Sequence, residues 1–396
     1  MNILFVNDIP FNPVAGGLER VTDVLTKELV KRGYTIYYLC GKLPESKKYL
    51  LDYNFPVQLF QLPKNGMFAD GDNVLFYKQL QSDLNIEIVI NQRGLDGLFN
   101  GLLTITQSQL ISVVHSIPDA GVIMFLNQLV ELTTPPFASF KRNIKKIFPS
   151  LFLSYWRRKF QKELRVKYND LAINSDVIVT LSPKCVETLE GIIDVPHKYR
   201  IVSIPNPNSF KVEGISFDTK SKVILYVGRL SKQEKEPLRL LEIWRYLYKK
   251  HQDWCLKIVG DGEEERKMRD YVNVHCLKNV YFEGRQSDVI PYYKESSFVC
   301  LTSNLEGWGM ALTEGMQYGC IPFTFDNYGA AFDIIDDDVN GCLIPAFDLK
   351  EYAKRLAELM SNDAKRLKMS KAAIEKVKEF SVENVADTWE ELFINL

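Results

Sequence analysis

Two glutamates stand eight residues apart in the stretch NLEGWGMALTEGMQYG, which covers residues 304–319. Glu306 precedes a pair of glycines, and Glu314 falls inside a segment with a helical pattern. Gly307 and Gly309 carry no side chain, so backbone amides at this helix start could contact a phosphate. The alternative is that both acids are solvated charges that favour a helix N-terminus. The functional interpretation is that both carboxylates hold hydroxyl groups of one ligand.

Two cations form a second candidate site, for an anion. Arg229 and Lys235 stand six residues apart in the stretch YVGRLSKQEKEPLRLLEIW, where an apolar run gives way to a helical pattern. Cations beside the N–H groups of a helix start suit a diphosphate. A pair of solvated surface charges is the alternative. The stretch lacks the Gly-x-x-x-x-Gly-Lys-Ser/Thr pattern, which argues against a P-loop.

The elements that must position these residues alternate between short apolar runs and longer amphipathic segments. This alternation is typical of α/β proteins with parallel sheets, whose strands are buried on both faces. The pattern starts again after a polar, turn-rich stretch near residues 208–220. It predicts two doubly wound, Rossmann-like domains facing each other across a cleft. The predicted strands cover residues 2–6, 87–91, 110–115, 176–182, 200–206, 223–229, 255–262, 280–285, 297–303 and 319–325.

Ligands bind outside the carboxyl ends of the strands in open parallel sheets. The candidate residues follow predicted strands, so we expect a ligand in the cleft between the domains. The residues in these positions are Gly16, Gly17, His115, Ser182, Asn206, Gly228, Arg229, Gly260, Gly262, Gly284, Arg285 and Glu306.

Length, charge and cysteine content limit the class of protein. The 396 residues are 46% hydrophobic, which is enough for two domains with separate cores. A net charge of −1 gives no overall attraction to nucleic acid or membrane. The seven cysteines are scattered without a Cys-x-x-Cys pair, so we expect reduced core residues. No export signal and no membrane span of ~18 apolar residues is recognisable, so we expect a cytoplasmic protein.

Several motifs together resemble one enzyme family. They are Arg229 and Lys235 after a strand, the sequences VGDG and VYFEGR, and Glu306 and Glu314 separated by seven residues. In this order they resemble the retaining glycosyltransferases of family 4, which have the GT-B fold of the glycogen synthase-like superfamily. AGGLER near the N-terminus and FSVENVADTWEELF near the C-terminus extend the resemblance over nearly the whole chain.

The resemblance implies a role for each domain. Residues 1–208 would bind the acceptor, residues 209–378 would bind a nucleotide sugar, and a helix within 379–396 would cross back to the first domain. Arg229 and Lys235 would bind the diphosphate and stabilise the leaving group. The nucleotide sugar would also be contacted through residues around the sheet edges: Glu306 at the sugar hydroxyls, Glu314 at the ribose, His115 near the transferred sugar, Arg285 at the base through its backbone, Gly307, Trp308, Gly309 and Met310 at the β-phosphate, and Gly16, Gly17 and Gly228 near the diphosphate.

The chain departs from the family pattern at two positions. Glu236 follows the phosphate lysine where glycine is common, and Trp308 stands where phenylalanine is usual. His115 also has a structural alternative, because a single histidine at a strand end is often only a satisfied polar group. The four histidines show no metal-ligand spacing. The acidic run at residues 336–338 precedes Asn-Gly and predicts an exposed turn.

A basic segment stands apart in the first half of the chain. Residues 141–167 contain ten basic residues and one acidic residue, interleaved with large apolar side chains. This pattern favours an anionic membrane surface. A solvated helix face with a buried apolar stripe is the alternative, and nucleic acid fits less well because no recognition motif is present. The candidate contacts with the membrane or acceptor are Lys145, Lys146, Trp156, Arg157, Arg158 and Lys159.

These observations lead to one hypothesis with two alternatives. We expect a retaining, metal-independent glycosyltransferase without a cofactor, at the inner face of the cytoplasmic membrane. It would transfer a sugar, from a UDP-sugar in preference to GDP-mannose, to a growing surface polysaccharide such as capsule or lipopolysaccharide, or to a lipid-linked oligosaccharide. A non-hydrolysing sugar-nucleotide epimerase and a non-catalytic sugar-nucleotide binding protein are the alternatives. Free epimerised nucleotide would favour the epimerase, whereas intact Glu306 and Glu314 argue against the binding protein.

Overall fold

The computed structural model describes residues 1–13, 16–41, 57–64, 70–94, 101–105, 107–120, 148–196, 200–210 and 220–396, with residues 148–154 described by their backbone only. The chain divides into two compact units. The first unit contains Met1–Pro10 and Gly33–Ser203, and the second contains Phe11–Arg32 and Ile204–Leu396. The helix that follows the first strand therefore belongs to the second unit.

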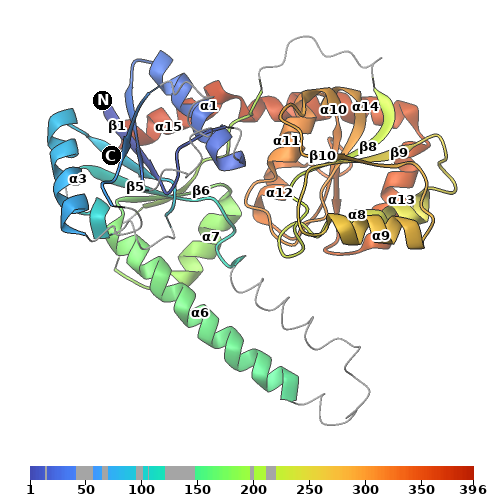
Figure 1. Cartoon of the computed structure of the whole chain (residues 1–396), viewed down its shortest axis with the longest axis horizontal. Coiled ribbons are helices and arrows are strands. Elements are labelled where there is room, and N and C mark those ends of the chain that lie inside the picture. The colour runs from blue at the N-terminus through green and yellow to red at the C-terminus, as the bar shows by residue number, and fades with distance from the viewer. Residues whose placement is uncertain are drawn as a thin grey trace. The chain divides into compact units, whose positions relative to one another are not determined.

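A parallel sheet forms the centre of the first unit (Figure 1). Among the described residues its strands have the order β3-β2-β1-β4-β5-β6-β7. Apolar side chains fill β1, β4 and β5 almost completely, and nearly all of them are buried, as in sheets covered on both faces. The sequence predicted these strands except β2 and β3. The strands are β1 (Asn2–Asn7), β2 (Thr35–Cys40), β3 (Gln58–Gln61), β4 (Ile88–Asn91), β5 (Gln109–Val114), β6 (Val177–Thr180) and β7 (Arg200–Ser203).

Two apolar clusters join helices to this sheet. In one cluster, Tyr77 and Leu80 of α3 pack with side chains from β1, β2 and β4. In the other, Tyr168 and Leu171 of α6 and Leu189 of α7 pack with side chains from β5 and β6. The N-terminal part of α6 extends beyond the sheet and α7 (Figure 1). The helices are α3 (Gly71–Leu84), α6 (Phe148–Asn174) and α7 (Pro183–Ile192).

A second parallel sheet forms the centre of the second unit. Its strands have the order β10-β9-β8-β11-β12-β13. All residues of β11 and β12 are buried, as expected for the middle of a doubly wound sheet. The sequence predicted these strands except the three-residue β13. The strands are β8 (Ser221–Val227), β9 (Cys255–Val259), β10 (Val280–Gly284), β11 (Ser296–Cys300), β12 (Ile321–Phe325) and β13 (Cys342–Ile344).

Helices lie on both sides of the second sheet. In the view of Figure 1, α10, α11 and α14 lie above it and α8, α9 and α13 lie below it. α8 packs against α9 and α13, and α11 packs against α10 and α14, which defines the two layers. This sheet with helices on both faces is the doubly wound arrangement that the sequence predicted. The helices are α8 (Leu238–Leu247), α9 (Glu265–Val274), α10 (Ile290–Glu295), α11 (Met310–Gln317), α12 (Gly329–Ile334), α13 (Leu349–Met360) and α14 (Asp363–Val377).

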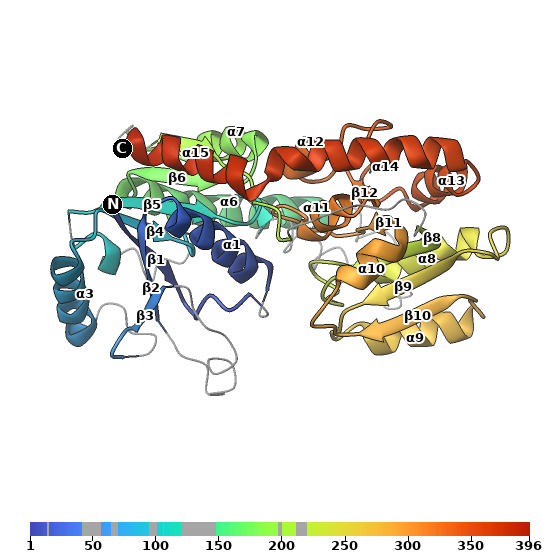
Figure 2. The ribbon, with the colours of Figure 1, turned by 90° about the horizontal axis from the view of Figure 1, so that it is seen from above.

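Two helices from opposite ends of the chain pack together in the second unit. α1 (Gly17–Lys31) contacts α15 (Val382–Ile394), which continues from α14 (red in Figure 2). Arg32, at the end of α1, donates to the carboxylates of Asp387 and Glu390 and to the carbonyl of Glu383. The resulting charge-assisted hydrogen bonds tie the C-terminal end of α1 to α15.

The cysteines differ in part from the expectation that they are reduced core residues. Five cysteines are buried, but Cys255 is half-buried and Cys276 is exposed, so the expectation that all seven are core residues is wrong. Cys276 follows the end of α9 with a φ of 48°, which places it in a surface turn. No helix in the described ranges is long and apolar enough to span a membrane.

Candidate active site

Strands β8 and β11 are neighbours at the point where the second sheet changes direction. From β8 the chain moves outward to β9 and β10, and it then returns to β11 on the other side of β8. The loops after two such strands lead to opposite faces of the sheet and leave room for a ligand. These loops, residues 228–237 and 301–309, contain Arg229, Lys235 and Glu306.

Hydrogen bonds fix the two loops to each other. The backbone N–H groups of Asn304 and Leu305 donate to the carbonyl of Glu234 at 2.8 and 3.1 Å. The amide side chain of Asn304 donates to the carbonyls of Lys232 and Gln233. Residues on two different loops are thereby held in a defined relative position, which a binding site requires.

Lys235 and Glu306 form an ion pair across these loops. Lys235 Nζ lies 2.6 Å from Glu306 Oε1, and Ser303 Oγ donates to the same oxygen at 2.7 Å. Only 7% of Glu306 is exposed, so its charge needs such partners. Glu306 Oε2 and the remaining N–H groups of Lys235 can still bind a ligand. The pair therefore offers an acceptor for hydroxyl groups beside a cation for a phosphate.

Arg229 has a different partner. Its guanidinium donates to Glu234 at 2.7 Å, and its side chain is 72% exposed. Tyr226 fixes the loop below it by donating to the Arg229 carbonyl at 2.9 Å. Burial raises the pKa of Tyr226, so the hydroxyl stays protonated as this donor role requires. The structure thus places Arg229 and Lys235 on one loop, but each forms an ion pair with a separate glutamate.

The start of α11 follows Glu306 directly. Gly309 has a φ of 92°, a left-handed conformation that favours glycine, and it precedes the first residue of the helix. Trp308 is buried, with its ring at right angles to that of Phe380 and 5.0 Å from it. Its predicted contact with a donor therefore depends on its backbone N–H. The helix start supplies the amides of Gly307, Trp308, Gly309 and Met310 that the sequence assigned to a phosphate.

Glu314 lies in α11 and is only 4% exposed. Arg20, in the first turns of α1, donates to Glu314 Oε1 at 2.8 Å. Tyr293, at the end of α10, donates to Oε2 at 2.9 Å. Burial and the charge of Glu314 raise the pKa of Tyr293, which keeps this donor protonated. The sequence pattern predicts Glu314 as a binding residue but does not predict Arg20, although Arg20 belongs to the AGGLER motif.

Two glycines let the loop after β9 approach the loop after β8. Gly260 and Gly262 have φ angles of 141° and 154°. A Cβ atom on Gly260 would lie 1.9 Å from the Gly228 carbonyl oxygen, and one on Gly262 would lie 2.5 Å from that of Leu230. These contacts explain the VGDG motif, since any side chain at either position would displace the loop that carries the two cations. Gly17, at the start of α1, lies against Met310 in the same unit.

Glu236 occupies a position that favours glycine. Its φ is 39°, in the left-handed region. Burial raises the pKa of its carboxyl group, and the nearby Arg239 and Lys267 oppose that shift. This chain therefore carries a partly buried acid on a backbone conformation that favours glycine. Arg285 is exposed just after β10, next to Gly284, whose φ is 68°.

Polar side chains also end the strands of the first unit. Asn7 and Asn91 lie at the ends of β1 and β4 and are almost fully buried. His115 follows β5 and contacts Gln92 through Nε2. Burial, with a smaller contribution from Arg93, lowers the pKa of His115 to about 4. The imidazole is therefore neutral near pH 7, and Nε2 donates to the amide oxygen of Gln92.

The predicted contacts with a membrane or acceptor fall on the basic segment of the first unit. Lys145 and Lys146 are outside the described residues. Arg157, Arg158 and Lys159 are exposed on α6, and Trp156 is half-buried with Lys159 Nζ 4.7 Å from its ring centroid. The acidic run at 336–338 forms the expected exposed turn, and its carboxylates pair with Arg355, Lys365 and Lys376. In the described ranges, no cluster of three or more His, Cys, Asp or Glu side chains could hold a metal ion.

The family comparison matches a segment of the second unit. Residues 209–376 match the family model for glycosyl transferases group 1. An uncharacterized glycosyltransferase of Haemophilus influenzae is 32% identical over 190 residues, which cover 48% of this chain and 54% of that protein. A Campylobacter jejuni N-acetyl-D-galactosaminyltransferase, whose name specifies a PP-undecaprenol-linked glycan, is 28% identical over 194 residues, covering 48% and 53%. The matched segments thus span about half the length of these relatives.

The fold comparison extends over the whole chain. A variant of TarM from S. aureus, solved with fondaparinux, α-GlcNAc-glycerol and UDP, covers 99% of this chain and 99% of its own, with a TM-score of 0.72 and 13% identity. Together with the two parallel sheets, this likeness shows the predicted GT-B fold.

Proposed function

We propose that this chain is a retaining, metal-independent glycosyltransferase that uses a nucleoside diphosphate sugar. The observation that carries the proposal is the Lys235–Glu306 ion pair at the start of α11. It joins an anion-binding group and a hydroxyl-binding group at the direction change of a doubly wound sheet. The match of residues 209–376 to glycosyl transferases group 1 covers these same loops and supports the proposal.

The donor is a UDP-sugar in this proposal, with GDP-mannose as the second choice. Lys235, Arg229 and the amides at the start of α11 neutralise the diphosphate, so no metal ion is required for that purpose. Glu306 accepts hydrogen bonds from sugar hydroxyls, and Glu314 accepts them from the ribose. The bound UDP in the TarM variant supports the choice of uridine.

The transfer itself follows from charge and proton balance. The bond between the sugar anomeric carbon and the phosphate oxygen breaks, and the acceptor oxygen bonds to that carbon on the same face. The acceptor hydroxyl proton passes to the leaving phosphate, whose charge is stabilised by Lys235 and Arg229. Neutral His115 donates from Nε2 to Gln92, so its Nδ1 can only accept a hydrogen bond, from a sugar hydroxyl, and adds no charge.

The acceptor is a growing surface polysaccharide or a lipid-linked oligosaccharide. The PP-undecaprenol-linked glycan in the name of the Campylobacter relative supports this part. The surface of α6 supports a location at a membrane, because Tyr155, Val166 and Ile173 are 63%, 62% and 69% exposed. At 100° per residue these three side chains fall within about 20° on one face of the helix.

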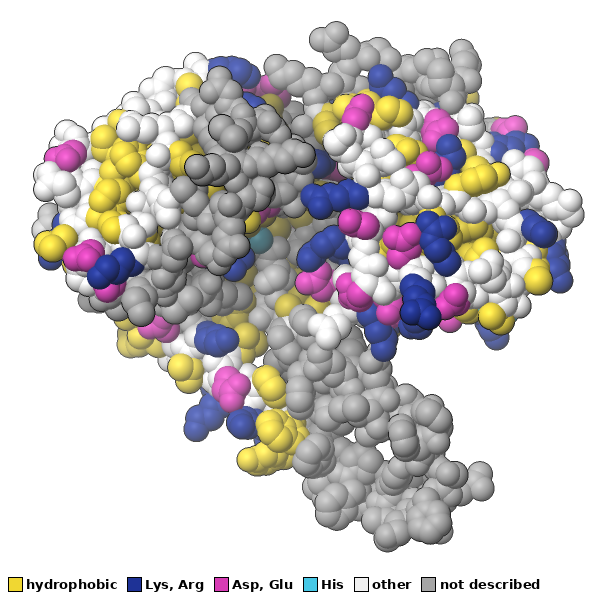
Figure 3. Space-filling view, in the orientation of Figure 1, with side chains coloured by type: hydrophobic (Ala, Val, Ile, Leu, Met, Phe, Trp, Pro, Cys, Tyr) yellow, Lys and Arg dark blue, Asp and Glu magenta, His cyan; other side chains and the backbone are white. Residues whose placement is uncertain are grey.

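Basic side chains accompany this apolar face. By the same helical spacing, Lys159 and Lys162 lie within about 40° of Tyr155. Hydrophobic (yellow) and basic (dark blue) side chains are neighbours over α6 in Figure 3. A helix with both kinds of side chain on one face fits the surface of an anionic bilayer.

Donor binding tests the proposal directly. Wild type is mixed with UDP, GDP, UDP-sugars and GDP-mannose, and its thermal unfolding is followed, since a ligand that binds only the folded state raises Tm. One nucleotide series should stabilise wild type but not Lys235→Ala. Lys222→Ala is the matched control, because this lysine pairs with Asp253 at the opposite end of β8. The proposal is overturned if no nucleotide stabilises wild type, or if Lys235→Ala responds as Lys222→Ala does.

A further inference from the structure

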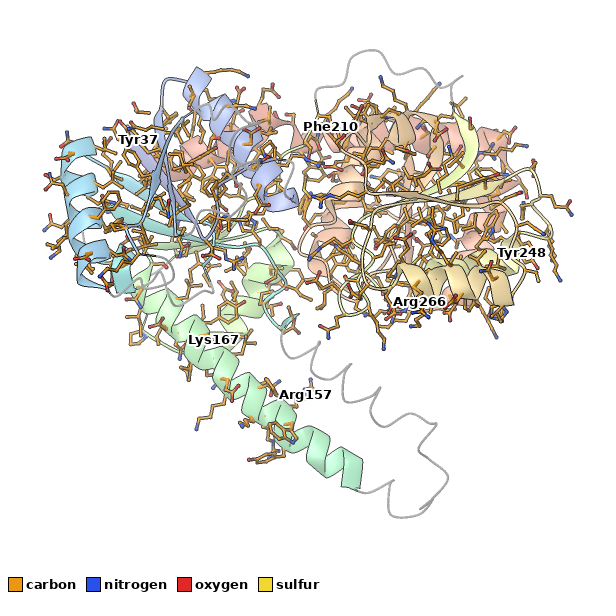
Figure 4. All side chains as sticks on the ribbon, in the orientation of Figure 1. Tyr37, Arg157, Lys167, Phe210, Tyr248 and Arg266 are labelled. Atoms are coloured by element: carbon orange, nitrogen blue, oxygen red, sulfur yellow. The ribbon has the colours of Figure 1, made fainter. Side chains whose placement is uncertain are left out.

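Arg20 contacts Glu314 although 294 positions of sequence separate them. Both residues belong to the second unit. The Arg20 side chain is largely buried between the Glu314 carboxylate and the ring of Phe210, with Cζ 5.6 Å from the ring centroid. Phe210, labelled in Figure 4, also packs against Tyr293 and Tyr318. Arg20 is therefore held on two sides.

Arg20 and Tyr293 leave Glu314 with free acceptor capacity. Arg20 binds Oε1 and Tyr293 binds Oε2, so each carboxylate oxygen has one of these two as partner. A carboxylate oxygen can accept about two hydrogen bonds. Each oxygen can consequently accept one more, and two acceptors side by side match the two hydroxyls of a vicinal diol.

A buried carboxylate can act in this way only if its partners hold it in place. An ionised side chain that is almost fully buried is costly unless a counter-charge and hydrogen bonds accompany it. Arg20 supplies the charge, and Tyr293 supplies a neutral donor. Without Arg20, the Glu314 carboxylate would lose its counter-charge and one of these two donors, and it would turn away from this position, which would remove an acceptor from the diol.

Arg32 provides an internal comparison on the same helix. It also forms ion pairs, with Glu28 on α1 itself and with Asp387 and Glu390 on α15. Loss of Arg32 would loosen α1 without changing the surroundings of Glu314. An effect of Arg20 on ligand choice can thus be separated from an effect on the packing of α1.

We propose that Arg20 is a positioning residue, which holds the Glu314 carboxylate in the orientation that binds the ribose hydroxyls of the donor nucleotide. This inference rests on the proposed function. It predicts that Arg20 determines the discrimination between ribose and dideoxyribose, whereas Lys235 and Arg229 determine the affinity for the diphosphate. A competing role, in which Arg20 blocks Glu314 until the nucleotide displaces it, predicts the opposite change in affinity.

The test is calorimetric titration of the full chain with UDP and with 2′,3′-dideoxy-UDP. Wild type should prefer UDP by about tenfold or more, since hydrogen bonds to a charged group are strong. In Arg20→Met that preference should disappear, because UDP binds more weakly and dideoxy-UDP binds as before. Arg20→Lys should retain part of the preference, and Arg32→Met should retain all of it. Should Arg20→Met not fold, the reduced preference in Arg20→Lys carries the test.

The possible contrary results have different meanings. Equal weakening of both ligands in Arg20→Met would show that Arg20 only holds α1, and tighter UDP binding would show a blocking role; both overturn the inference and leave the proposed function intact. Equal binding of the two ligands by wild type would remove Glu314 from ribose recognition, and the inference with it. If wild type binds neither UDP nor GDP, the proposed function itself is wrong; if it binds only GDP, the titration uses GDP and 2′,3′-dideoxy-GDP.

Discussion

At the scale of single residues, Glu236 destabilises the loop in which it lies. A φ of 39° disfavours any residue with a Cβ atom, by about 1–2 kcal/mol. Burial also disfavours the charged carboxylate, as the raised pKa of Glu236 indicates. Both effects destabilise the loop that carries Lys235, so this acid has a structural cost.

Replacing Glu236 by glycine should stabilise the protein. Glu236→Gly should raise the free energy of unfolding by about 1 kcal/mol at pH 7, because glycine accepts the left-handed conformation. The measurement is urea unfolding of both proteins, followed by a signal from the second unit. Lower stability of Glu236→Gly would show that the carboxylate makes a favourable contact that outweighs the backbone strain.

The same residue predicts a pH dependence. A raised pKa means that folded Glu236 binds a proton more tightly than the unfolded chain does, so its contribution to stability falls as pH rises through that pKa. Glu236→Gln should remove this loss while keeping the backbone strain. The stability difference between Glu236→Gln and wild type should therefore grow from pH 4 to pH 7. A constant difference would contradict the assigned cause.

The two paired glutamates should differ in their kinetic effects. Glu306→Gln should mainly lower kcat, if its contact with the sugar strengthens in the transition state. Glu314→Gln should mainly raise the KM for the donor, because ribose is held equally before and during transfer. Steady-state rates with the donor found by thermal shift provide the measurement. If both variants change kcat and KM alike, the two carboxylates do not have separate roles.

At the scale of elements, the sequence predicted the strands that have a clear apolar pattern. It did not predict features that depend on contacts between distant segments. The predicted strands at residues 87–91 and 223–229 contain continuous apolar runs at 88–90 and 223–227, and the structure confirms them as β4 and β8. β13 is only three residues long and therefore shows no pattern of its own. Arg20 was missed for a physical reason: the need for a counter-charge arises from the burial of Glu314, and burial depends on packing between remote segments.

The exposed face of α6 predicts binding to anionic membranes. Lys159→Ser with Lys162→Ser removes two charges from the face that carries Tyr155 and Val166. Each cation near the headgroups contributes about 1 kcal/mol, so binding should fall about 30-fold. Sedimentation with vesicles of neutral or anionic lipid measures the change. High salt should weaken binding, because the Debye screening length shortens to roughly 3 Å at 1 M.

A second double variant controls for net charge. Arg157→Ser with Lys167→Ser removes the same charge from side chains labelled on α6 in Figure 4, more than about 100° around the helix from Tyr155. This variant should bind vesicles better than the first. If both bind alike, or if wild type stays in the supernatant with anionic vesicles at low salt, α6 does not bind membranes through the face that carries Tyr155.

At the scale of the whole molecule, the two units differ in where their charged side chains lie. The net charge is only −1, although α6 of the first unit carries a basic face and the second unit contains buried ion pairs. Each unit has its own parallel sheet and its own apolar core. Arg20, Lys235, Glu306 and Glu314 all belong to the second unit, so the proposed contacts with a nucleoside diphosphate are confined to it.

This distribution predicts that a nucleotide stabilises one unit selectively. Proteins with two cores commonly unfold in separable steps, so calorimetry should resolve two transitions. UDP at about 100 times its Kd adds about 2.7 kcal/mol to the unit that binds it, which should raise one Tm by about 5–10 °C. Hydrogen exchange identifies the unit: amides of β8 and β11 should gain protection, and those of β1 and β4 should not. Lys235→Ala should lose the shift.

A contrary result would be an equal shift of both transitions, or equal protection of both sheets. Either result would show that nucleotide binding involves the first unit as well. The assignment of the diphosphate contacts to the second unit alone would then be wrong.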